Sequence, residues 1–208
     1  MIDGEQSAMI DGEQYAVRGR EPSAADPASK SAHIESPLLV HTLQLHTMQL
    51  KTLSAECTAR QLSVSACNRF RSLPALPYLC KLVLESLPCV TDLSWVGGLS
   101  QLRYLTLRDL PLTSLPSELS ALPHLHELYL YKLALLTALP ASIGNGTITT
   151  LELNLLPGVT HLPPLSNVRA LRLNYLVGLC SLDCISGVGG GSLRRLSLGD
   201  LPGVSHLE

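Results

Sequence analysis

Two pairs of side chains in this chain have types and spacings that could do chemistry. His124 and His126 could share a metal ion, but His124 falls before the expected strand and no third ligand is apparent. Cys180 and Cys184 could form a redox pair, although no C-x-x-C motif occurs in the sequence. Cys180 follows Leu179 in an apolar turn, which favours a core or edge cysteine. We therefore predict a surface histidine pair, no metal site and no redox pair.

Two further motifs have a suggestive composition without the context that they need. Residues 187–191 read Gly-Val-Gly-Gly-Gly but lack the lysine and the following helix of a phosphate-binding loop, which indicates a flexible connector. Asn145-Gly146-Thr147 is a glycosylation acceptor sequence, which matters only in a secreted protein. No motif orders the serines, histidines and acids into a catalytic triad. The sequence thus predicts a protein that is not an enzyme and that holds no cofactor.

The charge balance argues against two classes of partner. The 208 residues carry 15 basic and 17 acidic side chains, so with a net charge of −2 neither nucleic acid nor a membrane is an expected partner. The N-terminus has no basic region followed by an apolar one, so we predict no signal peptide, and no apolar run is long enough to span a bilayer. Six cysteines without a pairing motif favour free thiols, and we expect a cytoplasmic protein.

Residues 1–36 differ in composition from the rest of the chain. They hold seven acids and three bases, few large apolar residues, and the sequence MIDGEQ twice, at Met1–Gln6 and Met9–Gln14. Such a segment buries too little apolar surface to offset the entropy of ordering. We predict a disordered acidic N-terminal tail over residues 1–36 and one folded domain over residues 37–208.

The residues from 37 onward repeat a pattern of leucines. Its clearest form is L-x-x-L-x-L, whose residues we number positions 1 to 6 of a unit, and successive units start 19 to 25 residues apart. A second half, L-P-x-V-[ST]-x-L, matches at residues 87–93, 156–162 and 201–207. Eight copies can be aligned, and they begin at Val40, Ala59, Leu79, Leu102, Leu125, Ile148, Val168 and Leu193.

The spacing within a unit predicts the architecture. Apolar residues at positions 4 and 6 alternate with polar ones, as in a short strand with one buried face. Prolines and glycines then turn the chain back, with a helical turn expected at residues 117–122 and none at residues 164–167. Because one unit cannot bury its own leucines, the units must stack. We predict an α/β repeat solenoid with a parallel β-sheet on the concave face and short turns or helical turns on the convex face.

On these repeats the chain resembles the leucine-rich-repeat superfamily over about residues 38–208. The resemblance implies a horseshoe-shaped solenoid. Many members have Asn at position 9, whereas this chain has Leu in six units, with Met48 and Cys67 in the first two. In this respect it is similar to cysteine-containing or plant-resistance-like repeats and to trypanosomatid leucine-rich-repeat proteins.

Positions 3, 5 and 7 point away from the core and form three columns across the predicted concave face. Tyrosine and arginine are frequent anchors of protein interfaces, and three of the six tyrosines fall in these columns in neighbouring units, where we expect their rings to form one patch. The sequence thus predicts a protein–protein interaction module that binds another protein through its concave sheet. The predicted partner-binding residues are Tyr104, Arg108, Glu127, Tyr129, Tyr131, Glu152, Asn154 and Arg172.

One alternative from a different class stays open. The chain could be the ligand-sensing or substrate-receptor part of a larger receptor or ubiquitin-ligase-type protein whose effector domain is missing here. A repeat fold alone does not separate the two functions, because function depends on the site that the fold carries. Further domains in the full-length gene would favour the alternative.

The last unit raises a separate expectation. It stops at Glu208, directly after the apolar Leu207, and no polar capping repeat follows. We therefore predict that a C-terminal cap is absent and that Leu193, Leu196, Leu198 and Leu207 form an uncovered apolar edge. Such edges mark association surfaces, so we expect self-association through the last repeat.

Overall fold

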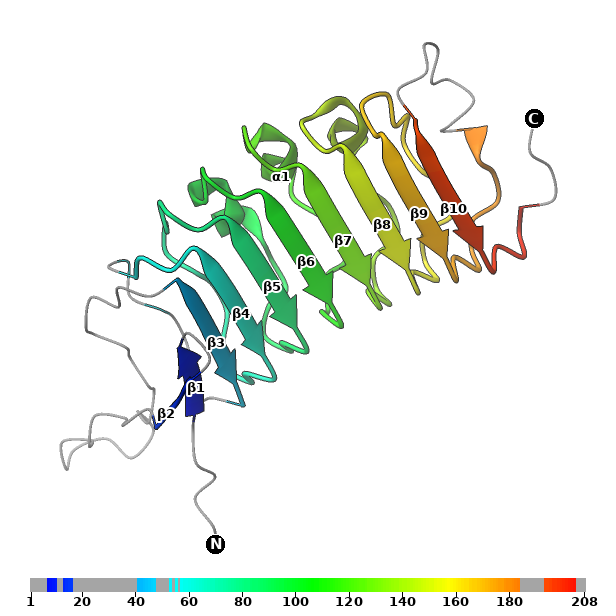
Figure 1. The fold of residues 1–208 in the computed structure, drawn as a ribbon. Helices are drawn as coiled ribbons and strands as arrows, with labels where there is room; N and C mark the ends of the chain where they lie inside the picture. The colour runs from blue at the N-terminus through cyan, green and yellow to red at the C-terminus, as the bar shows by residue number, and fades with distance from the viewer. Residues whose placement is uncertain are drawn as a thin grey trace, which may run out of the picture.

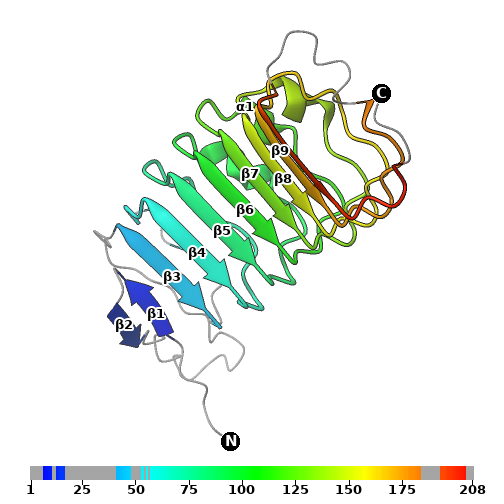
Figure 2. The same ribbon diagram turned by 45° about the vertical axis from the view of Figure 1, so that its right-hand side comes forward.

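The computed structural model describes residues 7–10, 13–16, 41–47, 53, 55, 57–183 and 193–204. These residues form one sheet of ten strands in the order β10-β9-β8-β7-β6-β5-β4-β3-β1-β2. Strands β3 to β10 are parallel and lie in chain order, as Figures 1 and 2 show. The strands are β1 Ser7–Ile10, β2 Glu13–Ala16, β3 Thr42–His46, β4 Gln61–Ser65, β5 Lys81–Glu85, β6 Tyr104–Arg108, β7 Glu127–Tyr131, β8 Thr150–Asn154, β9 Ala170–Asn174 and β10 Arg195–Gly199.

The chain returns from each parallel strand to the next behind the sheet. Within the described residues, these returns contain the short helical segments η1 Ser94–Gly98, α1 Glu118–Ala121 and η2 Ala141–Asn145 (Figure 1). The helical turn predicted at residues 117–122 is confirmed as α1, and residues 164–167 form a turn without a helix, as expected. The 3-10 helices η1 and η2 were not predicted. The parallel-sheet solenoid expected from the repeats is therefore confirmed.

The core lies between the sheet and the returning segments. In β3 to β9, positions 4 and 6 are at most 2% exposed, from Leu43 in the first unit to Leu173 in the seventh. Position 9 is also buried in the second to seventh units, by Cys67 in the second and by leucines in the others. Each leucine moved from water into such a core stabilises the fold by about 1.5–3 kcal/mol. Stacked leucines, rather than aromatic side chains, thus hold the units together, and the single phenylalanine, Phe70, is buried among them.

A residue in the left-handed backbone region follows every parallel strand, at position 8. Its φ lies between 51° and 55° in all eight units, and none of these residues is glycine. Its amide continues the ladder into the next unit: the N–H of Ser86, for example, donates to the carbonyl of Arg108 at 3.0 Å. This conformation costs about 1–2 kcal/mol for a residue with a side chain. The eight residues are Thr47, Ala66, Ser86, Asp109, Lys132, Leu155, Tyr175 and Asp200.

The N-terminal segment differs from the sequence-based expectation. Strands β1 and β2 pair antiparallel, and β1 also pairs antiparallel with β3, with Ala8 opposite Leu45 and Ile10 opposite Leu43. These eight residues are strands where a disordered tail over residues 1–36 was predicted, and they lie at the N-terminal edge of the sheet (Figure 2). The rest of the predicted tail lies outside the described residues.

Backbone pairing explains why the composition of the tail was misleading. The free edge of β3 presents N–H and C=O groups that an extended segment can bond, whatever its side chains. Asp11-Gly12, between the two N-terminal strands, is a pair that favours a two-residue hairpin loop. The sequence therefore contains a signal for a hairpin, although the low hydrophobicity of the segment predicts disorder.

The opposite end of the sheet leaves part of its core uncovered. Leu196 in β10 is 43% exposed, whereas Leu151 and Leu171 at the same repeat position are 0% and 2% exposed. Leu193 and Leu198 are half-buried. This agrees with the predicted apolar edge for the three of its four leucines that the structure describes, and Leu207 lies outside the described residues.

Candidate functional site

The strand register brings the predicted columns together on one surface. We call the surface made by positions 3, 5 and 7 of β3 to β10 the sheet face. In the column of position 5, Tyr129 lies opposite Glu152, and Glu152 lies opposite Arg172. In the column of position 7, Arg108 lies opposite Tyr131. The three columns predicted from the repeat spacing are therefore confirmed.

Two tyrosines of β7 form the aromatic centre of the sheet face. The rings of Tyr129 and Tyr131 are stacked, with centroids 6.5 Å apart and planes 5° from parallel. The Tyr129 hydroxyl donates a hydrogen bond to Oε2 of Glu127 on the same strand. The guanidinium carbon of Arg108, on β6, lies 4.9 Å from the centroid of the Tyr131 ring. A cation at this distance from a ring face is attracted by its quadrupole, so both rings are held from two sides.

A charged pair adjoins the tyrosines on β8 and β9. Nη1 of Arg172 donates to Oε2 of Glu152 at 2.6 Å. Glu152 is only 8% exposed, while the Arg172 side chain is 57% exposed. A buried carboxylate needs such a partner because desolvation disfavours its charge. Arg172 therefore anchors the carboxylate and still leaves part of its side chain exposed to solvent.

This environment disfavours ionisation of both tyrosines. Desolvation by burial is the largest cause for Tyr129, and the neighbouring Glu127 carboxylate adds to it, so the pKa lies well above its ordinary value of 10. Burial followed by the Glu152 carboxylate raises the pKa of Tyr131 to about 12, although Arg108 and Arg172 act in the opposite direction. Both hydroxyls are thus protonated donors at neutral pH.

A hollow lies in the sheet face beside Tyr129. It has a volume of about 430 Å³, spans β7 to β10 and is lined by charged side chains of both signs, Glu127 and Glu152 on one side and Arg172 and Arg195 on the other. A smaller hollow of about 190 Å³ over β3 to β5 is lined mostly by uncharged polar residues. The larger hollow can take up a side chain that projects from a bound partner.

Six of the eight predicted binding residues make contacts within this surface. The cation–ring contact, the stack and the hydrogen bond join Arg108, Tyr131, Tyr129 and Glu127, and the ion pair joins Glu152 to Arg172 on the next two strands. Tyr104 is 41% exposed at position 3 and makes no ring contact with the other two tyrosines among the described residues. Asn154 lies opposite Tyr131 in the register. The expected single patch of three tyrosines is thus a pair, with Tyr104 apart.

Three residues of the surface were not chosen from the sequence. Arg195 and Ser197 on β10 and Thr150 on β8 line the larger hollow. The signal that could have found them is the register, because Arg195 and Ser197 occupy positions 3 and 5 of the unit after Arg172. Glu85, on β5, also reaches Arg108, with Oε1 and Nη1 3.8 Å apart.

The other candidate motifs of the sequence are the histidine pair, the cysteine pair and the glycine-rich segment. Among the described residues, no three histidines, cysteines or acids are grouped closely enough to hold a metal ion. His126 contacts the carbonyl of Thr147 at 3.3 Å through Nδ1. Five cysteines are free thiols, and Cys184 and the segment 187–191 lie outside the described residues.

Two further observations concern sequence features that bear on compartment. Asn145 of the acceptor sequence is exposed at the end of η2, while the Thr147 hydroxyl lies 2.7 Å from the carbonyl of Leu125. No helix within the described part of the chain is long and apolar enough to cross a membrane.

Comparison with known proteins supports the fold. No protein-family model and no curated protein sequence matches this chain. Among solved structures, it is similar to the leucine-rich repeat domain of the type III effector XopL, with a TM-score of 0.61 and 17% sequence identity. The match covers 85% of this chain and 79% of that domain. The chain therefore has the fold of a leucine-rich-repeat solenoid.

Proposed function

We propose that this protein is an interaction module that binds another protein through the sheet face and carries out no bond chemistry of its own. The observation that supports this most directly is a cluster on four adjacent strands, in which the contacts of Arg108, Tyr131 and Tyr129 lie beside the Glu152–Arg172 ion pair. Tyrosine and arginine dominate the binding energy of many protein interfaces. A rigid repeat scaffold presents them on a continuous surface.

The cluster is also prepared for binding before a partner arrives. The stack and the bond to Glu127 hold the Tyr129 side chain in one orientation. Ordering a mobile side chain on binding costs about 0.5–1.5 kcal/mol, and a side chain that is already held avoids most of that cost. The hollow beside Tyr129 adds a concave place for a partner's side chain.

A receptor role within a larger protein remains the alternative to an independent module. The solved structure to which the chain is similar is itself a domain of an effector protein. In this alternative the same sheet face recognises a substrate or ligand, and an effector domain elsewhere acts on it. The two differ in what is joined to the solenoid, so the domain content of the full-length gene decides between them.

Substitution of Tyr129 tests the proposed face. A partner captured by affinity pull-down is identified by mass spectrometry, purified and titrated by calorimetry. Tyr129→Ala is expected to weaken binding by at least about 1–2 kcal/mol. Tyr129→Phe, which keeps the ring stack and loses only the bond to Glu127, is expected to have a smaller effect.

The matched controls lie in α1, behind the sheet. Ser117→Ala and Glu118→Ala alter two exposed side chains that are hydrogen-bonded to each other, and they are expected to leave the affinity unchanged. If these two variants abolish binding while Tyr129→Ala has no effect, the partner does not occupy the sheet face.

We also propose a cytoplasmic location. It is supported by the free thiols of Cys57, Cys67, Cys80, Cys89 and Cys180. Alkylation of the unfolded chain without reductant is expected to modify all six cysteines, including Cys184. A stable disulfide would instead indicate an oxidising compartment and would make the acceptor sequence at Asn145 relevant.

A further inference from the structure

The residues at the beginnings of the strands form a continuous row. At each step the N–H of position 2 donates to the carbonyl of position 2 in the preceding unit, with N···O distances between 2.7 and 3.1 Å. We call positions 2 and 3 of the units the entry edge of the sheet. The row at position 2 runs through His41, Arg60, Cys80, Arg103, His126, Thr149, Arg169 and Arg194.

The entry edge is strongly cationic. It carries six arginine or lysine side chains, all exposed, and a single acid, Glu127, whose carboxylate already accepts the Tyr129 hydroxyl. Among the described residues, the ion pairs are those of Arg108 and Arg172, so none of the six takes part in one. The six cations are Arg60, Lys81, Arg103, Arg169, Arg194 and Arg195.

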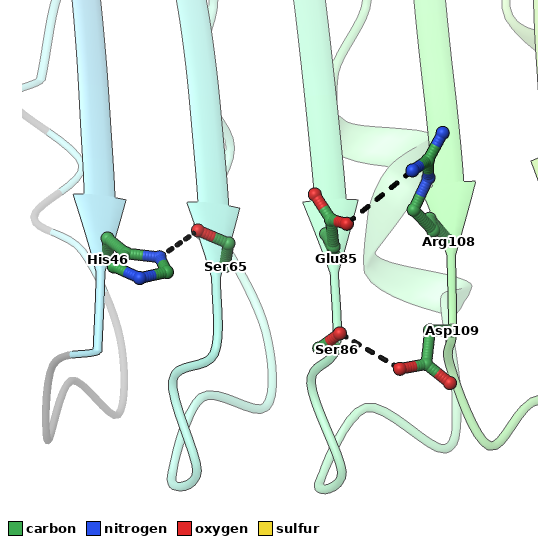
Figure 3. A network of polar contacts seen from close by, with 6 residues as sticks. All are labelled: His46, Ser65, Glu85, Ser86, Arg108 and Asp109. Carbon is green, nitrogen blue, oxygen red and sulfur yellow. Dashed lines mark hydrogen bonds and ion pairs between the residues drawn. The ribbon is translucent and has the colours of Figure 1, made fainter.

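The opposite edge of the same sheet is paired within the chain. Positions 7 and 8 form this exit edge, part of which is drawn in Figure 3. There Arg108 faces Glu85, and the Ser86 hydroxyl donates to Oδ2 of Asp109 at 2.9 Å. His46 and Ser65 are 2.7 Å apart (Figure 3). Arg108 on the exit edge thus has an acid beside it, whereas the six cations of the entry edge take part in no ion pair among the described residues and repel one another until an anion is supplied.

We propose that the entry edge binds an extended acidic segment of the partner protein, whose aspartate and glutamate side chains pair with these cations. This rests on the proposed function, because the partner must lie on the sheet face. Five of the six cations are arginines, whose planar guanidinium group can bind a carboxylate through two hydrogen bonds. The charges are complementary, and each cation is exposed.

An acidic polypeptide fits this surface better than a nucleic acid. The carboxylate of Glu127 lies directly beside the row, on β7, and that of Glu152 lies further along β8 in the same hollow, and they would repel a continuous line of phosphates. The net charge of −2 supplies no long-range attraction for a polyanion. A peptide can place its acids where the cations are and neutral residues elsewhere.

The cations fall into two groups, which suggests a spacing for the acids. Arg60, Lys81 and Arg103 begin β4 to β6, and the other three begin β9 and β10, while β7 and β8 contribute His126 and Thr149 to the row. From β6 to β9 is three strand intervals, about 14 Å at roughly 4.8 Å each. An extended peptide covers that distance in about four residues at roughly 3.3 Å per residue. We therefore expect two acidic clusters separated by about four residues.

A labelled synthetic peptide tests the proposal on the full chain. The probe has two runs of glutamate separated by about four serine and glycine residues, the spacing expected from the strand intervals. Its affinity is measured by fluorescence anisotropy at low and moderate salt. An oligothymidylate with the same number of negative charges is titrated alongside. The wild-type chain is expected to bind the peptide more tightly than the oligothymidylate, and salt should weaken that binding.

Two charge-reversal variants with the same change in net charge separate a site from general attraction. The triple variant Arg169→Glu, Arg194→Glu and Arg195→Glu alters the entry edge and is expected to bind the peptide about tenfold more weakly or worse. The control Arg69→Glu, Arg71→Glu and Lys132→Glu alters exposed cations elsewhere and should stay within about twofold of wild type. Circular dichroism checks folding, and arginine-to-glutamine changes at the same three entry-edge positions replace the reversal if it impairs folding.

Three results would overturn the proposal: equal losses of peptide affinity in both variants, no binding of the peptide to the wild-type chain at low salt, or tighter binding of the oligothymidylate that the entry-edge variant abolishes.

A failure of this proposal can be told apart from a failure of the proposed function. If Tyr129→Ala weakens binding of the captured partner while the entry-edge variant changes neither peptide binding nor partner binding, the sheet face binds a partner of different chemistry. If the entry-edge variant weakens peptide binding and Tyr129→Ala leaves partner binding unaffected, only the proposed role of the tyrosines at the centre of the sheet face is wrong.

Discussion

The two ends of the sheet differ in how their outermost parallel strands are covered. At the N-terminal end, β1 pairs with β3 along four residues, and the core leucines of β3 are at most 1% exposed. At the C-terminal end, β10 pairs with β9 alone, and Leu196 is 43% exposed. The same repeat position is therefore buried at one end and open at the other.

This difference separates two requirements of a stacked solenoid. The backbone of an outer strand needs hydrogen-bond partners along its free edge, and its leucines need an apolar neighbour. A short antiparallel hairpin supplies the backbone partners at β3. At β10 the leucines depend on the preceding unit, since Leu193 and Leu198 are only half-buried. Each requirement can be tested by a change at one end.

The largest expected effect contrasts the interior with the C-terminal end. Leu128→Ala and Leu151→Ala are expected to cost about 2–5 kcal/mol of unfolding free energy, because both side chains are fully buried. Leu196→Ala, at the same repeat position as these residues, should lower the unfolding free energy by about half as much or less. Urea unfolding measures all three. A loss under about 0.5 kcal/mol for the interior variants would mean that the assigned repeat register is wrong.

The next effect concerns the N-terminal hairpin. Met9 lies in the middle of β1, which has β2 on one side and β3 on the other, so Met9→Pro removes a backbone donor from the ladder. We expect a loss of about 1 kcal/mol or more in local stability, seen as faster hydrogen exchange of the β3 amides.

The control for the hairpin is a proline placed outside its strands. Ala25→Pro changes a residue of the predicted tail and should leave β3 exchange unaltered. Equal exchange in the wild-type chain and Met9→Pro would show that the hairpin does not protect β3, and the contrast between the two ends would then disappear.

The exposed leucine at β10 predicts a concentration-dependent effect. We expect copies of the chain to associate through the last repeat, because burying part of an exposed leucine is favourable by up to about 1.5–3 kcal/mol. Leu196→Lys should reduce this association in sedimentation experiments. Leu135→Lys removes another exposed leucine, 53% exposed and distant in sequence, and should not. Monomeric behaviour of the wild-type chain at high concentration would contradict the prediction.

The smallest effect is a pH dependence in the middle of the sheet, away from both ends. The folded-state pKa of Tyr131 is raised to about 12, and that of Tyr129 is also raised from 10. A raised pKa means that the folded state holds these protons more firmly than the unfolded state, so the associated stability is present below pH 10 and is lost as the pH rises toward 12. Tyrosinate absorbance should therefore show two tyrosines that titrate late and become ordinary in urea.

A variant at the C-terminal end and one in the middle of the sheet sharpen this titration. Leu196→Ala should leave the late-titrating tyrosines unchanged, because β10 does not contact β7. Tyr131→Phe should remove one of them. If all tyrosines of the folded wild-type chain titrate together, the stacked pair is not formed in solution.

The fold was predictable from the sequence because its physical basis is local. Side chains of a strand point alternately to its two faces, and this decides which of them are buried. Residues at the same position of successive units then lie opposite one another in neighbouring strands. For this reason Tyr129, Glu152 and Arg172 could be placed in one column before the structure was known. The stack of Tyr129 on Tyr131 could not, because side-chain rotamers depend on neighbours that a repeat pattern does not describe.

Two expectations failed for identifiable reasons. Tyr104 was grouped with the other tyrosines by strand adjacency, but position 3 places it at the entry edge, away from the column of Tyr131. The hairpin was missed because burial of apolar surface was used as the measure of order, whereas β1 is held by backbone hydrogen bonds. Asp11-Gly12 was the residue pair that carried the opposite information.

The left-handed residue after every strand has a consequence for how such a protein can change in length. Since the same backbone angle recurs in all eight units and the same bond to the next unit in the first seven, with side chains as different as Ala66 and Tyr175, the joint between units does not depend on a particular amino acid. A copying error that duplicates or deletes one whole unit therefore leaves every remaining joint intact. Gene-level expansion can then lengthen the binding surface by one strand at a time, about 4.8 Å per event.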